Sequence, residues 1–137
     1  MGLGFEFATA SRIVFGTGSR RMIGELVAGY GRQVLWVTGA SDRHTVWLSP
    51  QLEAAGLVVT RLTVASEPTI DAVEQAAAVA RSTGCEVVLG IGGGSVIDAT
   101  KAIAALAVQP HDAFSYLEVI GRGRSLDRPA LPCIAVP

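Results

Sequence analysis

The chain has 137 residues, of which 50% are hydrophobic and 17% are charged, and its formal net charge at pH 7 is -1. This length is typical of one domain with its own hydrophobic core, which needs no disulfide or structural metal. A near-neutral charge argues against a nucleic-acid-binding protein, because such proteins carry a basic excess on one face. Charged residues are scarcer than the about 25% of typical soluble domains. We therefore expect further polypeptide or a second copy in a homo-oligomer to cover part of the surface.

The sequence shows no membrane-spanning or secretory segment. No apolar run approaches the roughly 18–20 residues that span a bilayer, and residues 1–12 lack the basic and apolar regions of a signal peptide. Cys85 and Cys133 fall at or within predicted strands, where a free cysteine behaves as a small buried hydrophobe. These features predict a cytoplasmic protein without membrane contact.

Short β-rich runs alternate with helical runs along the chain. In order, we expect a strand at 12–15, a helix at 19–30, strands at 34–37, 57–64 and 86–91 separated by helices at 42–55 and 70–82, a helix at 96–108, a weak strand at 116–120 and a buried strand at 133–137. Ser19 and Thr69 are expected N-caps, Gly31 is an expected helix end, and Ser49-Pro50 is an alternative helix start. The alternation predicts an α/β domain over residues 1–137, with a Rossmann-like, mostly parallel sheet flanked by helices.

Three glycines, Gly92, Gly93 and Gly94, follow the 86–91 strand and precede a helix. Without Cβ atoms, such a turn lets a ligand approach the backbone, and the dipole and free N–H groups of the following helix favour an anion. Asp98 can reach a ribose hydroxyl or the neighbouring ring, or instead take part in a capping box with Ser95 in the first turn. The turn is therefore either a phosphate cradle or a purely structural tight turn.

Lys101 lies three residues after Asp98 on the same helix face. It can complement a phosphate charge or merely pair with Asp98. The segment from Gly90 to Ser95 also nearly matches the dinucleotide fingerprint G-x-G-x-x-G, but its last glycine is replaced by Ser95. The acidic residue expected about 20 residues later would be Asp112, in a predicted loop. An ordinary Rossmann fingerprint is therefore disfavoured.

Five motifs occur along the chain in a fixed order. They are FGTG at 15–18, VTG at 37–39, EPT at 67–69, GGGSVIDATK at 92–101 and PALPCIAVP at 129–137. Together they resemble the N-terminal half of the iron-containing alcohol dehydrogenases, within the dehydroquinate synthase-like superfamily, and the similarity covers essentially the whole chain. The resemblance implies the NAD(P)-binding half of an enzyme that transfers a hydride between an alcohol, aldehyde or ketone and a nicotinamide cofactor.

The resemblance also assigns cofactor contacts. It places Gly93, Gly94 and Ser95 on the pyrophosphate, with Gly92 in the same cradle and Lys101 near the phosphate charge. It places Asp98 on the nicotinamide side, and Gly39 and Ser41 on the adenosine ribose. Glu67 occupies a position near the adenosine where the family often has Asn. NAD-preferring relatives often carry Asp at the Gly39 position. Gly39, with Ser41 and nearby Arg43, therefore implies that NADP is tolerated.

The metal is implied to lie elsewhere. In the family, an aspartate and three histidines of an all-helical C-terminal domain hold a divalent metal, and the resemblance implies iron or zinc. This chain has only His44 and His111, which we expect to be exposed bystanders. We therefore expect no catalytic or metal-ligating residue within 1–137, and no activity from this segment alone.

Two related branches of the family fit the sequence less well than the alcohol dehydrogenases. Maleylacetate reductases generally lack the aspartate matching Asp98, and glycerol dehydrogenases tend to carry Lys at the Ser95 position. A stand-alone nucleotide-binding or interaction module without catalysis is the alternative from another class.

Overall fold

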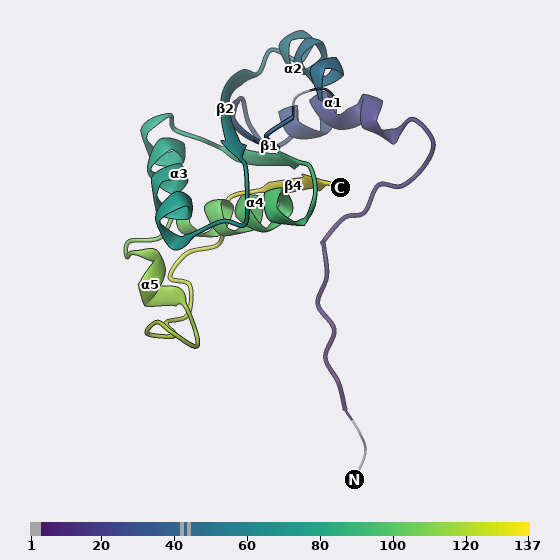
Figure 1. Ribbon diagram of the computed structural model, residues 1–137. Helices are drawn as coiled ribbons and strands as arrows, with labels where there is room; N and C mark the ends of the chain where they lie inside the picture. The colour runs from purple at the N-terminus through teal and green to yellow at the C-terminus, as the bar shows by residue number, and fades with distance from the viewer. Residues whose placement is uncertain (1–3, 42, 44) are drawn as a thin grey trace.

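A computed structural model describes residues 4–41, 43 and 45–137. In this part of the chain a parallel four-stranded sheet in the order β2-β1-β3-β4 carries helices on both faces (Figure 1), which confirms the predicted fold class. The strands are β1 (Gln33–Gly39), β2 (Val58–Val64), β3 (Val87–Ile91) and β4 (Cys133–Val136). The helices are α1 (Ile23–Ala28), α2 (Ser49–Ala54), α3 (Ile70–Ser82), α4 (Gly94–Leu106) and α5 (Ala113–Tyr116), with 3-10 turns at Ser19–Met22 and Val46–Leu48.

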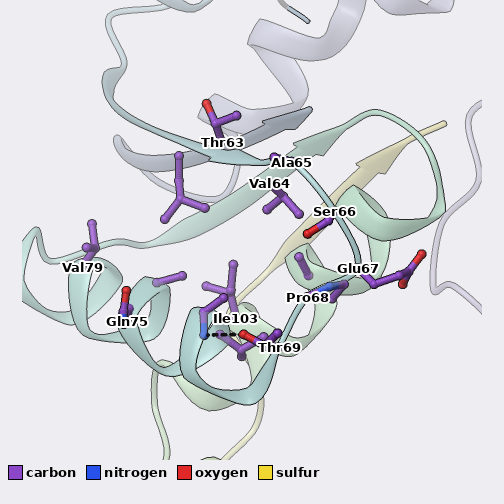
Figure 2. A pocket seen from close by; sticks show the side chains of 15 residues that line it. Thr63, Val64, Ala65, Ser66, Glu67, Pro68, Thr69, Gln75, Val79 and Ile103 are labelled. Carbon is purple, nitrogen blue, oxygen red and sulfur yellow. Dashed lines mark hydrogen bonds between the residues drawn. The ribbon is translucent and has the colours of Figure 1, made fainter. Parts of the chain in front are cut away.

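Helices α3 and α4 cover one face of the sheet, which we call the α3–α4 face. Its core is rich in alanine, and Leu35 and Val37 of β1 point into it. A Cβ on Gly90 would lie 2.8 Å from the Cβ of Thr100, so glycine lets α4 pack directly on β3. A hollow of about 330 Å³ remains between β2, α3 and α4 (Figure 2), beneath the loop that leaves β2.

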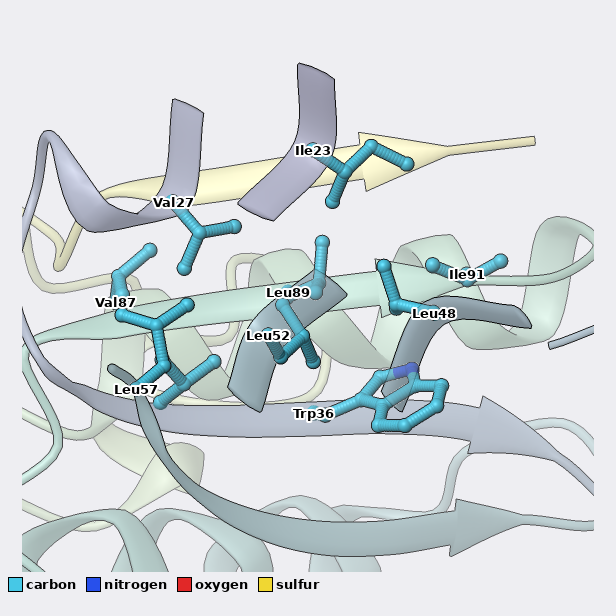
Figure 3. Packing of buried hydrophobic residues seen from close by; sticks show 10 residues of the cluster. Ile23, Val27, Trp36, Leu48, Leu52, Leu57, Val87, Leu89 and Ile91 are labelled. Atoms are coloured by element: carbon cyan, nitrogen blue, oxygen red, sulfur yellow. The ribbon is translucent and has the colours of Figure 1, made fainter. Parts of the chain in front are cut away.

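Helices α1 and α2 cover the other face, the α1–α2 face. Here the core consists of large side chains, with Val34 and Trp36 of β1 packing against Leu48 and Leu52 (Figure 3). Successive residues of β1 thus point into opposite cores, as a strand requires. Residues 34–38 and all of β3 are buried, which confirms the two continuously apolar runs as central strands.

Two helix starts follow the predicted signals. Thr69 caps α3 by accepting a hydrogen bond from the backbone N–H of Ala72 at 3.2 Å. Helix α2 begins at Ser49 with Pro50 in its first turn, where the missing N–H costs nothing, so the alternative start is correct to within one residue, the N-cap being Leu48 and not Ser49. Of the longer helix expected over 42–55, residue 42 lies outside the described residues and residues 46–48 form a 3-10 turn.

The predicted strand at 12–15 is wrong. Residues 4–18 are exposed and run away from the body of the domain (Figure 1), and Phe15 is 98% exposed. β-Branched residues form a strand only when they pair with another strand, and this segment pairs with none of the four described strands, although residues 10–12 and 14 line a hollow together with β4. Ser19 is also no N-cap, because Gly18, with φ of +80°, precedes a 3-10 turn and the α-helix begins only at Ile23. That helix ends at Ala28 and Gly29 rather than at Gly31.

The C-terminal predictions need two corrections. The weak strand at 116–120 is wrong, because Asp112 caps a one-turn helix at Ala113–Tyr116 through the N–H of Ser115 at 3.0 Å. The strand at 133–137 forms, but β4 pairs only with β3 and its residues alternate between exposed and half-buried. Cys133 is consequently exposed and Cys85 is only half-buried, contrary to the burial predicted for both.

No helix in the described part of the chain has the length and apolar character needed to cross a bilayer.

Candidate functional site

The carboxyl ends of the parallel strands meet at one edge of the sheet. The register pairs Thr38 with Ile91, so the ends of β1 and β3 lie side by side. After β1 the chain turns to α2 and the neighbouring β2, whereas after β3 it turns to α4 on the opposite face and to β4 on the opposite side. Ligands of open α/β sheets bind where the strand order reverses in this way. The glycine turn and the loop after β1 flank this position.

The three glycines of the turn are not equivalent. A Cβ on Gly92, whose φ is +155°, would lie 2.8 Å from Val96 Cγ2, so the fold itself requires glycine there. A Cβ on Gly93 or Gly94 would meet no atom within 4 Å. Packing therefore does not explain these two glycines, whereas the approach of a ligand to the backbone does.

Helix α4 presents its unpaired backbone groups at the same place. Gly93 is the N-cap and offers no side chain, and the first intrahelical bond runs from Ile97 N to Gly93 O at 3.1 Å. The N–H groups of Gly94, Ser95 and Val96 thus have no partner carbonyl within the helix. Together with the helix dipole, they can hold an anion such as a pyrophosphate.

Gly39 is the last residue of β1, and Ser41 lies in the chain that leaves the strand. A Cβ on Gly39 would make ordinary contact with Val96 Cγ2 at 3.8 Å, so a side chain fits at this position without strain. Ser41 is exposed in the loop that follows. Because Val96 adjoins both Gly39 and Gly92, the structure brings the two predicted segments together around the start of α4.

Glu67 and Ser95 come from different motifs and are in direct contact. The Ser95 hydroxyl donates a hydrogen bond to Glu67 Oε1 at 2.7 Å, which joins the loop after β2 to the first turn of α4. Both residues were predicted near the cofactor, but nothing in the sequence links them. The predicted pyrophosphate position therefore carries a carboxylate at its rim.

Asp98 and Lys101 form an ion pair on the surface of α4. Lys101 Nζ lies 3.0 Å from Asp98 Oδ1, with the two side chains 61% and 63% exposed. Asp98 is the fifth residue of the helix, beyond its first turn, and the N-cap Gly93 has no side chain, so the capping-box alternative is wrong. The pairing alternative for Lys101 is confirmed, and contact of either residue with a cofactor remains a prediction.

The structure describes one of the two histidines that we expect to be exposed bystanders. His111 is exposed, with its ring centroid 6.3 Å from that of Tyr116, and His44 lies outside the described residues. In residues 4–41, 43 and 45–137 no three His, Cys, Asp or Glu side chains are grouped so that they could hold a metal ion.

Thr38 is a polar residue near the site that the sequence analysis did not single out. Its side chain is 1% exposed, and its hydroxyl has no hydrogen-bond partner among the described residues. The sequence signals for Thr38 are its place in the VTG motif at 37–39 and its hydroxyl near the end of an otherwise apolar strand.

Comparisons with known proteins agree with the motif resemblance. A model of the family described as iron-containing alcohol dehydrogenase matches residues 10–137. The chain is 34% identical over 115 residues to a probable NADH-dependent butanol dehydrogenase of Bacillus subtilis, covering 80% of this chain and 30% of that protein. It is 34% identical over 136 residues to a mitochondrial hydroxyacid-oxoacid transhydrogenase of Caenorhabditis elegans, covering 93% of this chain and 29% of that protein.

A solved structure has the same fold. The crystal structure of NADH-dependent butanol dehydrogenase A from Thermotoga maritima superposes with a TM-score of 0.80 at 31% identity, covering 96% of this chain and 34% of that one. The chain thus spans about a third of the length of the relatives it matches.

Proposed function

The chain belongs to the iron-containing alcohol dehydrogenase family, and we propose that it is the NAD(P)-binding part of a metal-dependent alcohol dehydrogenase. The observation that carries the proposal is the pair Gly93 and Gly94, which face open space at the N-terminus of α4, at the switch point of the sheet. The fold does not need glycine at these positions, whereas a dinucleotide phosphate does.

The residues of this chain bind and orient the cofactor. The N–H groups of Gly94, Ser95 and Val96, which have no partner within the helix, would hold the pyrophosphate. Gly39 and Ser41 would border the adenosine ribose, and the exposed Asp98–Lys101 pair would serve the nicotinamide side and the phosphate charge. When bound, the nicotinamide accepts or donates the hydride, and a divalent metal held by further polypeptide polarises the substrate oxygen. The relatives named as butanol dehydrogenases favour a small alcohol or aldehyde as substrate.

We also propose a cytoplasmic homo-oligomer. Phe5, Phe7 and Phe15 are 91%, 79% and 98% exposed, which leaves large apolar side chains to be covered by another copy or by further polypeptide.

The test uses the whole polypeptide that the gene encodes. We expect it to contain a bound divalent metal and to reduce NAD or NADP in the presence of an alcohol, whereas residues 1–137 alone should be inactive. An open reading frame that ends after Pro137, or alcohol oxidation by the 137-residue chain itself, would contradict the proposal. The first result would favour a nucleotide-binding module without catalysis.

NADP is expected to be accepted because nothing at position 39 repels a 2′-phosphate. Gly39→Asp places a carboxylate there, and the 3.8 Å distance to Val96 leaves room for it. We expect NADPH affinity to fall about tenfold or more while NADH affinity changes little. Gly39→Asn is the control, since it has nearly the same size without the charge. A strong preference of the unaltered enzyme for NADH would refute the expectation.

A further inference from the structure

The carboxylate of Glu67 stands where the proposed cofactor site needs positive potential. Its Oε1 accepts a hydrogen bond from the Ser95 hydroxyl at 2.7 Å, and Ser95 is the second residue of α4. A negative group beside a helix N-terminus interacts favourably with the dipole. Glu67 therefore takes, in the free protein, the electrostatic position that a phosphate would take in the complex.

We propose that Glu67 is a negative determinant of cofactor affinity, competing with the pyrophosphate of a dinucleotide for the Ser95 hydroxyl and the N-terminus of α4. The inference rests on the proposed function, since it concerns the same site. Two effects act together. The hydroxyl has one proton to donate, so it cannot serve Glu67 and a phosphate oxygen at once. The carboxylate also repels the incoming phosphates, and within the described residues no cation is paired with it.

The loop that carries Glu67 has room to yield. It leaves β2 above the hollow of about 330 Å³ between β2, α3 and α4, and Glu67 lies at this hollow together with Val64 and Ile103 (Figure 2). Glu67 is exposed, so its carboxylate can turn into solvent once the Ser95 hydroxyl is released. Cofactor binding then costs one hydrogen bond of the free state but does not disrupt the core.

The test compares Glu67→Gln with the unaltered protein, using the whole polypeptide. The amide keeps the size and the acceptor oxygen but loses the charge. Dissociation constants for NADH, ADP-ribose and adenosine are measured by calorimetry at low and high salt. We expect about tenfold tighter binding of NADH and ADP-ribose by the variant, unchanged binding of adenosine, and a difference that shrinks as salt screens the charge. Glu53→Gln, an exposed carboxylate on α2, is the matched control and should change none of these values.

A second pair separates competition for the hydroxyl from charge repulsion. Glu67→Ala removes the acceptor oxygen as well as the charge, so its gain in affinity beyond that of Glu67→Gln measures the competition for the Ser95 hydroxyl. In a Ser95→Ala background there is no hydroxyl to contest, and this extra gain should disappear. An extra gain of equal size in both backgrounds would refute the competition.

The other outcomes are equally decisive. Weaker NADH binding by Glu67→Gln would make Glu67 a direct cofactor contact and overturn the inference, as would unchanged binding. Failure of every variant and of the unaltered protein to bind NADH or NADPH would instead refute the proposed function itself.

Discussion

Large side chains cover the sheet on the α1–α2 face, including Trp36, Leu48 and Leu52, whereas alanines and a glycine–threonine contact cover it on the α3–α4 face. The difference has a positional consequence. Small residues let the backbone of α4 settle directly on β3, so the helix N-terminus is fixed against the strand end and the glycine turn. Among the described residues of the α1–α2 face, the close glycine contact of Gly24 with Gln51 joins α1 to α2 and not a helix to the sheet. We infer that one face supplies mainly stability and the other also sets the geometry of the site.

The largest effect on stability is expected on the α1–α2 face. Leu52 of α2 is 1% exposed, and Leu52→Ala leaves a cavity beneath the helix. We expect a loss of about 3 kcal/mol in the free energy of unfolding, measured by denaturant titration. Dinucleotide affinity under native conditions should not change. The control is Leu126→Ala, at a side chain that is 51% exposed. A change in affinity would show that this face also positions the site.

A smaller loss of stability with a larger functional effect is expected on the α3–α4 face. In Gly90→Ala the new methyl group would lie 2.8 Å from Thr100 Cβ, so α4 must shift away from β3. We expect a loss of about 2 kcal/mol in unfolding free energy, together with weaker dinucleotide binding. Thr100→Ala in the same chain removes Oγ1, the closest atom, and Cγ2, but keeps Cβ, so it should restore part of both quantities. If affinity survives Gly90→Ala unchanged, the contrast between the faces fails.

The buried hydroxyl of Thr38 offers a gain instead of a loss. This hydroxyl is unpaired among the described residues, and Thr38→Val replaces it with a methyl group of similar size. We expect the free energy of unfolding to rise by about 1 kcal/mol, because a buried polar group without a partner is removed. Thr63→Val, at an exposed position of β2, is the control. Destabilisation by Thr38→Val would indicate that the hydroxyl has a partner after all.

The smallest effect is confined to acid pH. The Glu86 carboxylate accepts hydrogen bonds from the backbone N–H groups of Gln33 at 2.9 Å and Arg32 at 2.6 Å, and these bonds lower its pKa below the ordinary 4.5. A lowered pKa in the folded state contributes stability that is present above the unfolded pKa and is lost as the pH falls through the folded one. Glu86→Gln should therefore flatten the acid limb of a stability-versus-pH curve.

The sequence predicts best what is encoded locally. The order of β3, the glycine turn and α4 is legible because an apolar run, the glycines and a helical run follow one another directly. Thr69 is legible as a cap for the same reason. The motifs likewise indicated the family that the comparisons confirm.

What the sequence could not show depends on position in the sheet. Residues 12–15 have the composition of a strand but pair with none of the described strands, and residues 133–136 form a strand that is only half covered because it lies at an edge. The Glu67–Ser95 contact joins two motifs that lie far apart in the sequence and meet only in the folded chain, so no local sequence pattern predicts it.

The parallel sheet also determines the order in which the molecule can be built. Its pairings join Gln33 to Val58, Val34 to Val87 and Val88 to Cys133, so no two strands can meet as a simple hairpin and every pairing must first close a long loop. During synthesis, β3 is complete well before residues 133–136 emerge. Its entirely buried apolar run then has one unpaired edge, which makes the unfinished chain prone to aggregation until β4 takes its place.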